Sequence, residues 1–113
     1  MSWRKFDNDK TVGQEGSEGG KIPLNEEHEL GARITLEKVG SFLKRHFAIT
    51  CGIYGWIMHT HFISSNNEAL KNFEVMKGEL GRILNLVPTI EKASDDNMSR
   101  VTDEISKFVN EFV

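Results

Sequence analysis

The chain has 113 residues, of which 27% are charged and 38% are hydrophobic, and its formal net charge is −3. These values fit one globular domain, and they argue against a disordered chain and against the basic surface of a nucleic-acid-binding protein. The single cysteine, Cys51, excludes an intrachain disulfide and fits a reducing compartment, so we expect a cytoplasmic protein.

Residues 46–67 contain no Asp, Glu, Lys or Arg and are long enough to cross a bilayer. Three histidines and several Ser and Thr side chains make this stretch too polar for lipid, where every polar group needs a partner. The first ten residues also lack the apolar run of a secretory signal. We therefore expect neither a membrane span nor secretion.

The first 27 residues are poor in apolar side chains and include a glycine-rich run from Gly13 to Gly20. This composition is typical of a flexible segment, so we predict an N-terminal arm over residues 1–27 and a single α+β domain over residues 28–113. Trp3 and Phe6 are the aromatic residues by which such an arm would dock.

A first strand is predicted from Glu29 to Glu37, where apolar and polar residues alternate. Gly40-Ser41 then has the chemistry of a two-residue hairpin turn, with glycine at the first central position. A turn centred there pairs Ile34 with Phe47 on one apolar face of the sheet.

A second reversal is predicted at residues 52–55, because glycines at both ends supply the positive φ that other residues resist. Centring the loop there pairs Cys51 with Trp56 and completes a three-stranded antiparallel meander. The alternative is one long strand bent at the two glycines, although strands beyond ten residues are unusual. In this register, the side chains predicted to face the apolar core include Phe47, Trp56, Met58 and Phe62.

Two amphipathic helices are predicted to follow the meander and to pack on one face of it. Ser65 and Glu68 form a capping box at the start of the first helix, Pro88 ends it, and the second helix begins near Ser94. The spacing in the second helix also fits a coiled-coil contact with another subunit. The apolar stripe of the first helix consists of Leu70, Phe73, Leu80, Ile83, Leu84 and Val87. That of the second helix consists of Met98, Val101, Ile105, Phe108 and Phe112.

The other face of the predicted meander carries the residues with the most reactive side chains. In these registers, Thr35 lies in one cross-strand row with His46 and His61, and the imidazole of His59 lies on the same face. Three converging imidazoles can hold zinc or another first-row divalent metal, so His46, His59 and His61 are the candidate metal ligands. Arg33 and Thr35 are candidate binding residues beside them.

No Ser-His-Asp order or paired-carboxylate motif rises above chance, so we lean against an enzyme and expect no cofactor. We expect a non-enzymatic binding or assembly module, most simply a homodimer, whose exposed sheet face contacts a protein or a small acidic ligand. The alternative is a metal-dependent or metal-binding protein built on the three histidines. A third hypothesis is a small-molecule pocket between the sheet and the N-terminal arm, closed by Trp3 or Phe6.

Overall fold

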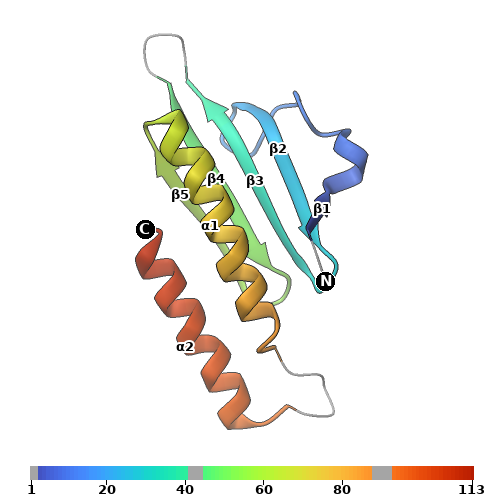
Figure 1. Cartoon of the computed structure of the whole chain (residues 1–113), viewed down its shortest axis with the longest axis vertical. Coiled ribbons are helices and arrows are strands. Elements are labelled where there is room, and N and C mark those ends of the chain that lie inside the picture. Colours follow the sequence, from blue (N-terminus) through green and yellow to red (C-terminus); the bar gives the residue numbers. More distant parts are fainter. Residues whose placement is uncertain (1–2, 41–44, 88–92) are drawn as a thin grey trace.

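In the described part of the chain, five antiparallel strands form one sheet in the order β1-β2-β3-β4-β5, and two helices follow them (Figure 1). The computed structural model describes residues 3–40, 45–87 and 93–113. The elements are β1 (Trp3–Lys5), the short 3-10 segment η1 (Phe6–Asp9), β2 (Lys21–His28), β3 (Ala32–Val39), β4 (His46–Ile53), β5 (Ile57–Ile63), α1 (Asn66–Leu84) and α2 (Asp95–Glu111).

The prediction of a three-stranded sheet with a flexible arm is wrong, because residues 3–28 contribute two further strands. β2 is hard to find in the sequence because it contains Pro23, a residue that cannot donate a ladder hydrogen bond and is depleted in strands. Its pairing with β3 is irregular at this point, between Lys21 and Leu24. The irregularity accommodates the proline within an otherwise continuous sheet.

The register between β3 and β4 differs from the prediction by four residues. Ile34 lies opposite Cys51 instead of Phe47. Because side chains alternate with a period of two, a shift of four leaves every side chain on its predicted face. The predicted turn residue Ser41 lies outside the described residues.

The second reversal is confirmed as a turn, which excludes the alternative of one long strand, but it is centred on Gly55 at a φ of +82°. Cys51 consequently lies opposite His59, three residues from the predicted partner Trp56. A shift of three inverts every side chain of β5 relative to the sheet. The predicted faces of β5 are therefore wrong. Met58 and Phe62, predicted to be core residues, are 79% and 53% exposed.

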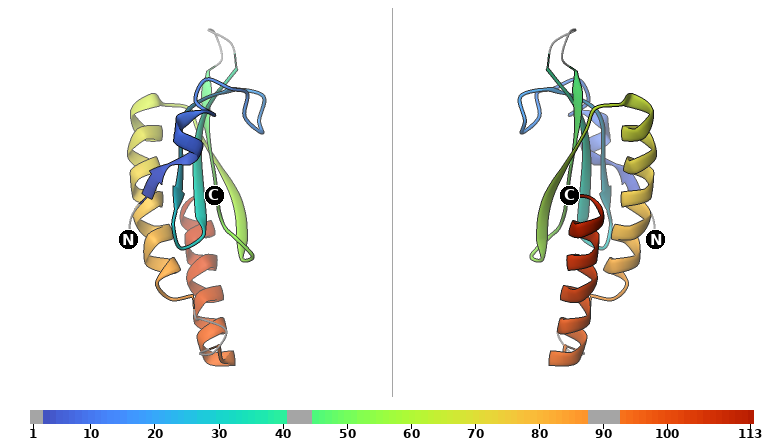
Figure 2. Two further views of the ribbon diagram at one scale, coloured as in Figure 1. Left: turned by 90° about the vertical axis from the view of Figure 1, so that its right-hand side faces the viewer. Right: turned by 90° about the vertical axis from the view of Figure 1, so that its left-hand side faces the viewer.

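The hydrophobic core lies between the sheet and the two helices (Figure 2). Ser65 and Ser94 cap α1 and α2 as predicted, each accepting a hydrogen bond from a backbone N–H three residues later, at 3.5 and 3.2 Å. Leu70, predicted for the buried stripe of α1, is 43% exposed, and Pro88 lies outside the described residues. The buried side chains of α1 are Ala69, Phe73, Met76, Leu80, Ile83 and Leu84.

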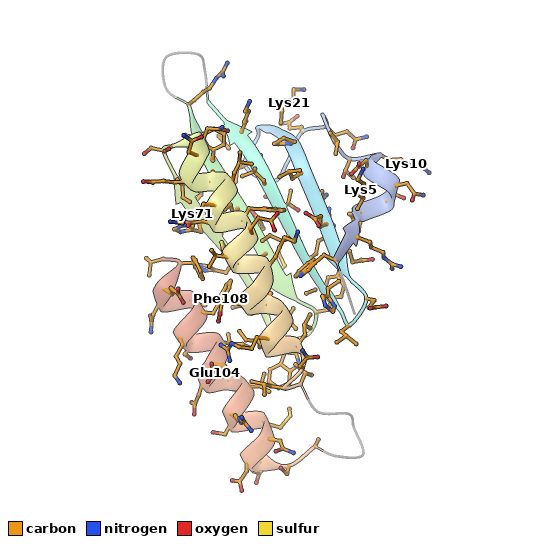
Figure 3. The ribbon with its side chains drawn as sticks, in the orientation of Figure 1. Lys5, Lys10, Lys21, Lys71, Glu104 and Phe108 are labelled. Atoms are coloured by element: carbon orange, nitrogen blue, oxygen red, sulfur yellow. The ribbon has the colours of Figure 1, made fainter. Side chains whose placement is uncertain are left out.

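α2 lies beside α1, and its first turns extend beyond the end of the sheet (Figures 1 and 2). Figure 3 shows Glu104 and Phe108 on the side of α2 that faces α1. Glu104 accepts a hydrogen bond from Arg82 of α1 at 2.9 Å, and Phe108 is buried. Val101, Phe108 and Phe112 of the predicted stripe are thus buried in the domain, whereas Met98 is 40% exposed. Neither α1 nor α2, the helices of the described chain, is long and apolar enough to span a membrane.

Candidate functional site

The structure divides the predicted site residues between the two faces of the sheet. Arg33, Thr35 and His46 lie on the face opposite the helices, which we call the outer face. His59 and His61 lie on the face that packs against the helices, called the helix face. The expected row of three imidazoles is therefore absent, and no group of three His, Cys, Asp or Glu among residues 3–40, 45–87 and 93–113 is placed to hold a metal.

His59 and His61 attach the end of α2 to β5. The imidazole Nε2 of His59 donates a hydrogen bond to the carbonyl oxygen of Phe112, and Nδ1 of His61 donates to that of Val113 at 2.9 Å. The ring of Phe112 also meets the imidazole of His61 edge-on, with centroids 5.8 Å apart. These contacts give both histidines a structural role in positioning α2.

A cavity of about 360 Å³ lies on the outer face, between the N-terminal segment (residues 6–20) and strands β3 to β5. Thr35, Thr50 and Gly52 line it from the sheet, and Tyr54 and Met58 line it from the β4–β5 hairpin. The N-terminal segment contributes its lining residues between positions 11 and 17. Figure 2 shows the loop after η1 on the side of the sheet away from α1. Two segments far apart in the sequence thus line one space.

Glu37 anchors the N-terminal segment on the outer face. Its carboxylate is only 1% exposed and accepts hydrogen bonds from the backbone N–H groups of Glu18, at 3.1 Å, and Gly20, at 2.6 Å. A side chain at position 20 would place its Cβ 2.0 Å from the carbonyl oxygen of Lys38, so only glycine permits this close approach. The glycine-rich run is therefore a docking element and not the flexible linker that its composition predicts.

Asn25 is a second buried anchor and connects the segment to the cavity. Its side-chain Nδ2 donates to Thr11 at 3.0 Å, while Oδ1 accepts from the Nε of Arg33 at 3.2 Å and from the hydroxyl of Thr35 at 2.9 Å. Every buried side-chain nitrogen and oxygen in the described part of the chain has a hydrogen-bond partner. The outer face is therefore held by a satisfied polar network.

Arg33 is fixed from two directions at the edge of the cavity. Asn25 holds its Nε, and the guanidinium lies over the ring of Phe6, 3.7 Å from the ring centroid. Glu27 faces Arg33 across the β2–β3 pair, but its carboxylate accepts hydrogen bonds from Arg4, at 3.2 Å, and from the Tyr54 hydroxyl, at 3.0 Å.

The charge pattern around Glu27 follows from these contacts. The hydrogen bonds from Arg4 and Tyr54 hold the pKa of Glu27 below its usual value. Burial and the bond to Glu27 raise the pKa of Tyr54, so its hydroxyl stays protonated at neutral pH. Glu27, which contacts the cavity-lining Tyr54, is therefore an ionised carboxylate already occupied by other donors.

Cys51 is not a reactive thiol. It is buried, as predicted, and burial alone raises its pKa to about 12. The thiolate is the nucleophilic form of cysteine, so this group is inert at neutral pH. Its side chain belongs to the core of the helix face.

Arg33 and Thr35 are site residues predicted from the sequence, whereas Asn25 and Glu37, which hold the N-terminal segment on the site, are not. Asn25 lies in the predicted arm, and Glu37 is predicted only as the last residue of the first strand. One signal was available, since a glycine-rich run offers many backbone N–H groups that a nearby carboxylate can accept.

Comparison of the chain with protein-family models, with curated proteins and with solved structures found no match. Inference about function therefore rests on the chemistry of the site.

Proposed function

We propose that this protein is a non-enzymatic binding module that takes a small ligand into the cavity on the outer face of its sheet. The observation that carries the proposal is the cavity itself, which is lined by residues 11–17 and by strands β3 to β5 and opens to solvent. Its volume of about 360 Å³ falls at the small end of the range for ligand pockets. The mixture of apolar side chains with a few polar groups is also typical of such pockets.

The chemistry of the lining favours binding over catalysis. The hydroxyl of Thr35 donates to Asn25, and the hydroxyl of Thr50 shares a hydrogen bond with that of Thr60 at 3.2 Å. A hydroxyl becomes a nucleophile only when a general base takes its proton, and these two contact neutral groups. They can orient a ligand without reacting with it.

The cavity is suited to binding because the sheet on one side and the N-terminal segment on the other are both held in place. A preformed site of this kind loses little entropy when a ligand enters. Glu37 holds the N-terminal segment through two backbone N–H groups, and Asn25 holds it through Thr11. Removing the segment would therefore open the cavity and weaken the fold together.

The proposal is tested by titrating the protein with the fluorescent dye 8-anilinonaphthalene-1-sulfonate and mapping the site by NMR chemical shifts. We expect saturable binding with shifts at Thr35, Thr50 and Tyr54. The variant Thr50→Trp fills the cavity and should abolish the binding, whereas Val75→Trp on the exposed side of α1 should leave it unchanged. Circular dichroism shows whether both variants are folded. Shifts that spread over the surface without saturation would contradict the proposal.

Self-association through the β5 half of the outer face is a second candidate, favoured by two exposed apolar side chains. Met58 and Phe62 point outward from an edge strand that carries no charged residue. Analytical ultracentrifugation of the wild type and of Phe62→Thr tests it, and a wild-type monomer at high concentration would contradict it.

The metal-binding alternative has no such support, because His46 lies on the opposite face of the sheet from His59 and His61.

A further inference from the structure

Arg33 is the cationic group of the cavity lining, and most of its hydrogen-bonding capacity is unused. A guanidinium has five N–H donors, and Asn25 takes the one on Nε. The ring of Phe6 covers one face of the guanidinium and takes none of the donors. Among the described residues, no carboxylate lies within ion-pair distance of Arg33, and its two terminal nitrogens form no hydrogen bond. The charge of Arg33 contributes to the lowered pKa of Glu27, but only as a minor cause behind the hydrogen bonds from Arg4 and Tyr54. Arg33 also lines the cavity.

Two carboxylates on the outer face near Arg33 are hydrogen-bonded to other groups. Glu27 binds Arg4 and Tyr54, and Glu37 binds backbone N–H groups of the N-terminal segment. Glu15 also lines the cavity, but no ion pair joins its carboxylate to Arg33 in the described part of the chain. Arg33 therefore keeps a positive charge that a ligand can meet.

On the basis of the proposed function, we infer that the ligand is a small organic monoanion, a carboxylate on a compact apolar body, and that Arg33 recognises its charge. The two terminal nitrogens of an arginine match the two oxygens of a carboxylate in a fork-like pair. Ile22, Tyr54 and Met58 supply apolar surface for the rest of the molecule.

The geometry selects a monoanion over a phosphate ester. Arg33 is the only Lys or Arg among the residues that line the cavity in the described structure, and Glu15 lines the same space. A phosphate dianion would place a second negative charge near Glu15 without a second cation to balance it. A single carboxylate is balanced by Arg33 alone.

The inference is tested with a matched pair of probes, 3-phenylpropionate and its neutral amide, titrated calorimetrically and by NMR. We expect the wild type to bind the acid about ten- to a hundredfold more tightly than the amide, which is the value of a hydrogen-bonded charge pair. Arg33→Gln should lose this preference while still binding the amide. Arg33→Lys keeps the positive charge but cannot form the bidentate pair with a carboxylate, so it should retain part of the preference for the acid.

Arg100→Gln is the matched control, because Arg100 lies exposed on α2 and should keep the full preference. Equal binding of acid and amide, with shifts at the cavity, would overturn the monoanion while leaving the binding module intact. Failure of both probes and of the fluorescent dye to bind would overturn the inference together with the proposed function. An unchanged preference in Arg33→Gln would overturn the role of Arg33.

Discussion

The two faces of the sheet are covered in different ways. The helix face is closed by two regular elements, and its central side chains, including Ile34, Ile49 and Phe73, are fully buried. The outer face is covered in part by an irregular segment held through Glu37 and Asn25. On the helix face, apolar side chains fill the space between the sheet and the helices. On the outer face, polar contacts fix the N-terminal segment at a few points and leave a cavity beside it.

The energetics of the two faces differ accordingly. Burying a large apolar side chain stabilises a protein by about 1.5–3 kcal/mol, and a typical hydrogen bond contributes about 0.5–1.5 kcal/mol net. The helix face therefore supplies most of the stability, and the outer face supplies the geometry of the site. This division predicts how substitutions on each face should behave.

The largest effect is expected in the core of the helix face. Phe73→Ala should lower the free energy of unfolding by about 3–5 kcal/mol, because it leaves a cavity at a fully buried position. Val75→Ala, two residues along on the exposed side of α1, should change it by about 0.5 kcal/mol or less. Urea unfolding followed by circular dichroism measures both. Similar losses in the two variants would contradict the proposed core.

An intermediate effect is expected at the anchor of the outer face. Glu37→Ala should lower the free energy of unfolding by about 1–3 kcal/mol, because the N–H groups of Glu18 and Gly20 lose their acceptor. Glu37→Gln keeps an acceptor oxygen and should cost less. Amide hydrogen exchange should accelerate at Gly20 but not at Phe73 of α1. Unchanged exchange at Gly20 would mean that this carboxylate does not hold the segment.

The smallest effect is expected on the uncovered part of the outer face. Met58→Thr should change the free energy of unfolding by about 0.5 kcal/mol or less, since the side chain is 79% exposed. Ile63→Thr, on the helix face of the same strand, should be more damaging because it buries a hydroxyl in the core. Chemical denaturation measures both variants. A larger loss of stability in Met58→Thr than in Ile63→Thr would mean that β5 presents its other face to the helices.

Local signals located most of the elements. The capping serines Ser65 and Ser94 begin their helices as predicted, because a cap depends on residues three positions apart. The alternation in β3 also placed Cys51 correctly on the core side, since an even shift of register preserves the faces. Arg33 and Thr35 were chosen for the same reason, as outward-facing residues of a well-patterned strand.

The amino-acid sequence by itself determined the helix starts, the apolar faces of β3 and β4, and the presence of a turn near Gly55. Only the tertiary structure decided the face of β5, because an odd shift at one turn inverts a strand and the local residues fit several turns. The tertiary structure also decided whether the N-terminal segment packs on the sheet. A glycine-rich run is flexible unless acceptors such as Glu37, far along the chain, bind its backbone N–H groups. The cavity exists because that contact forms.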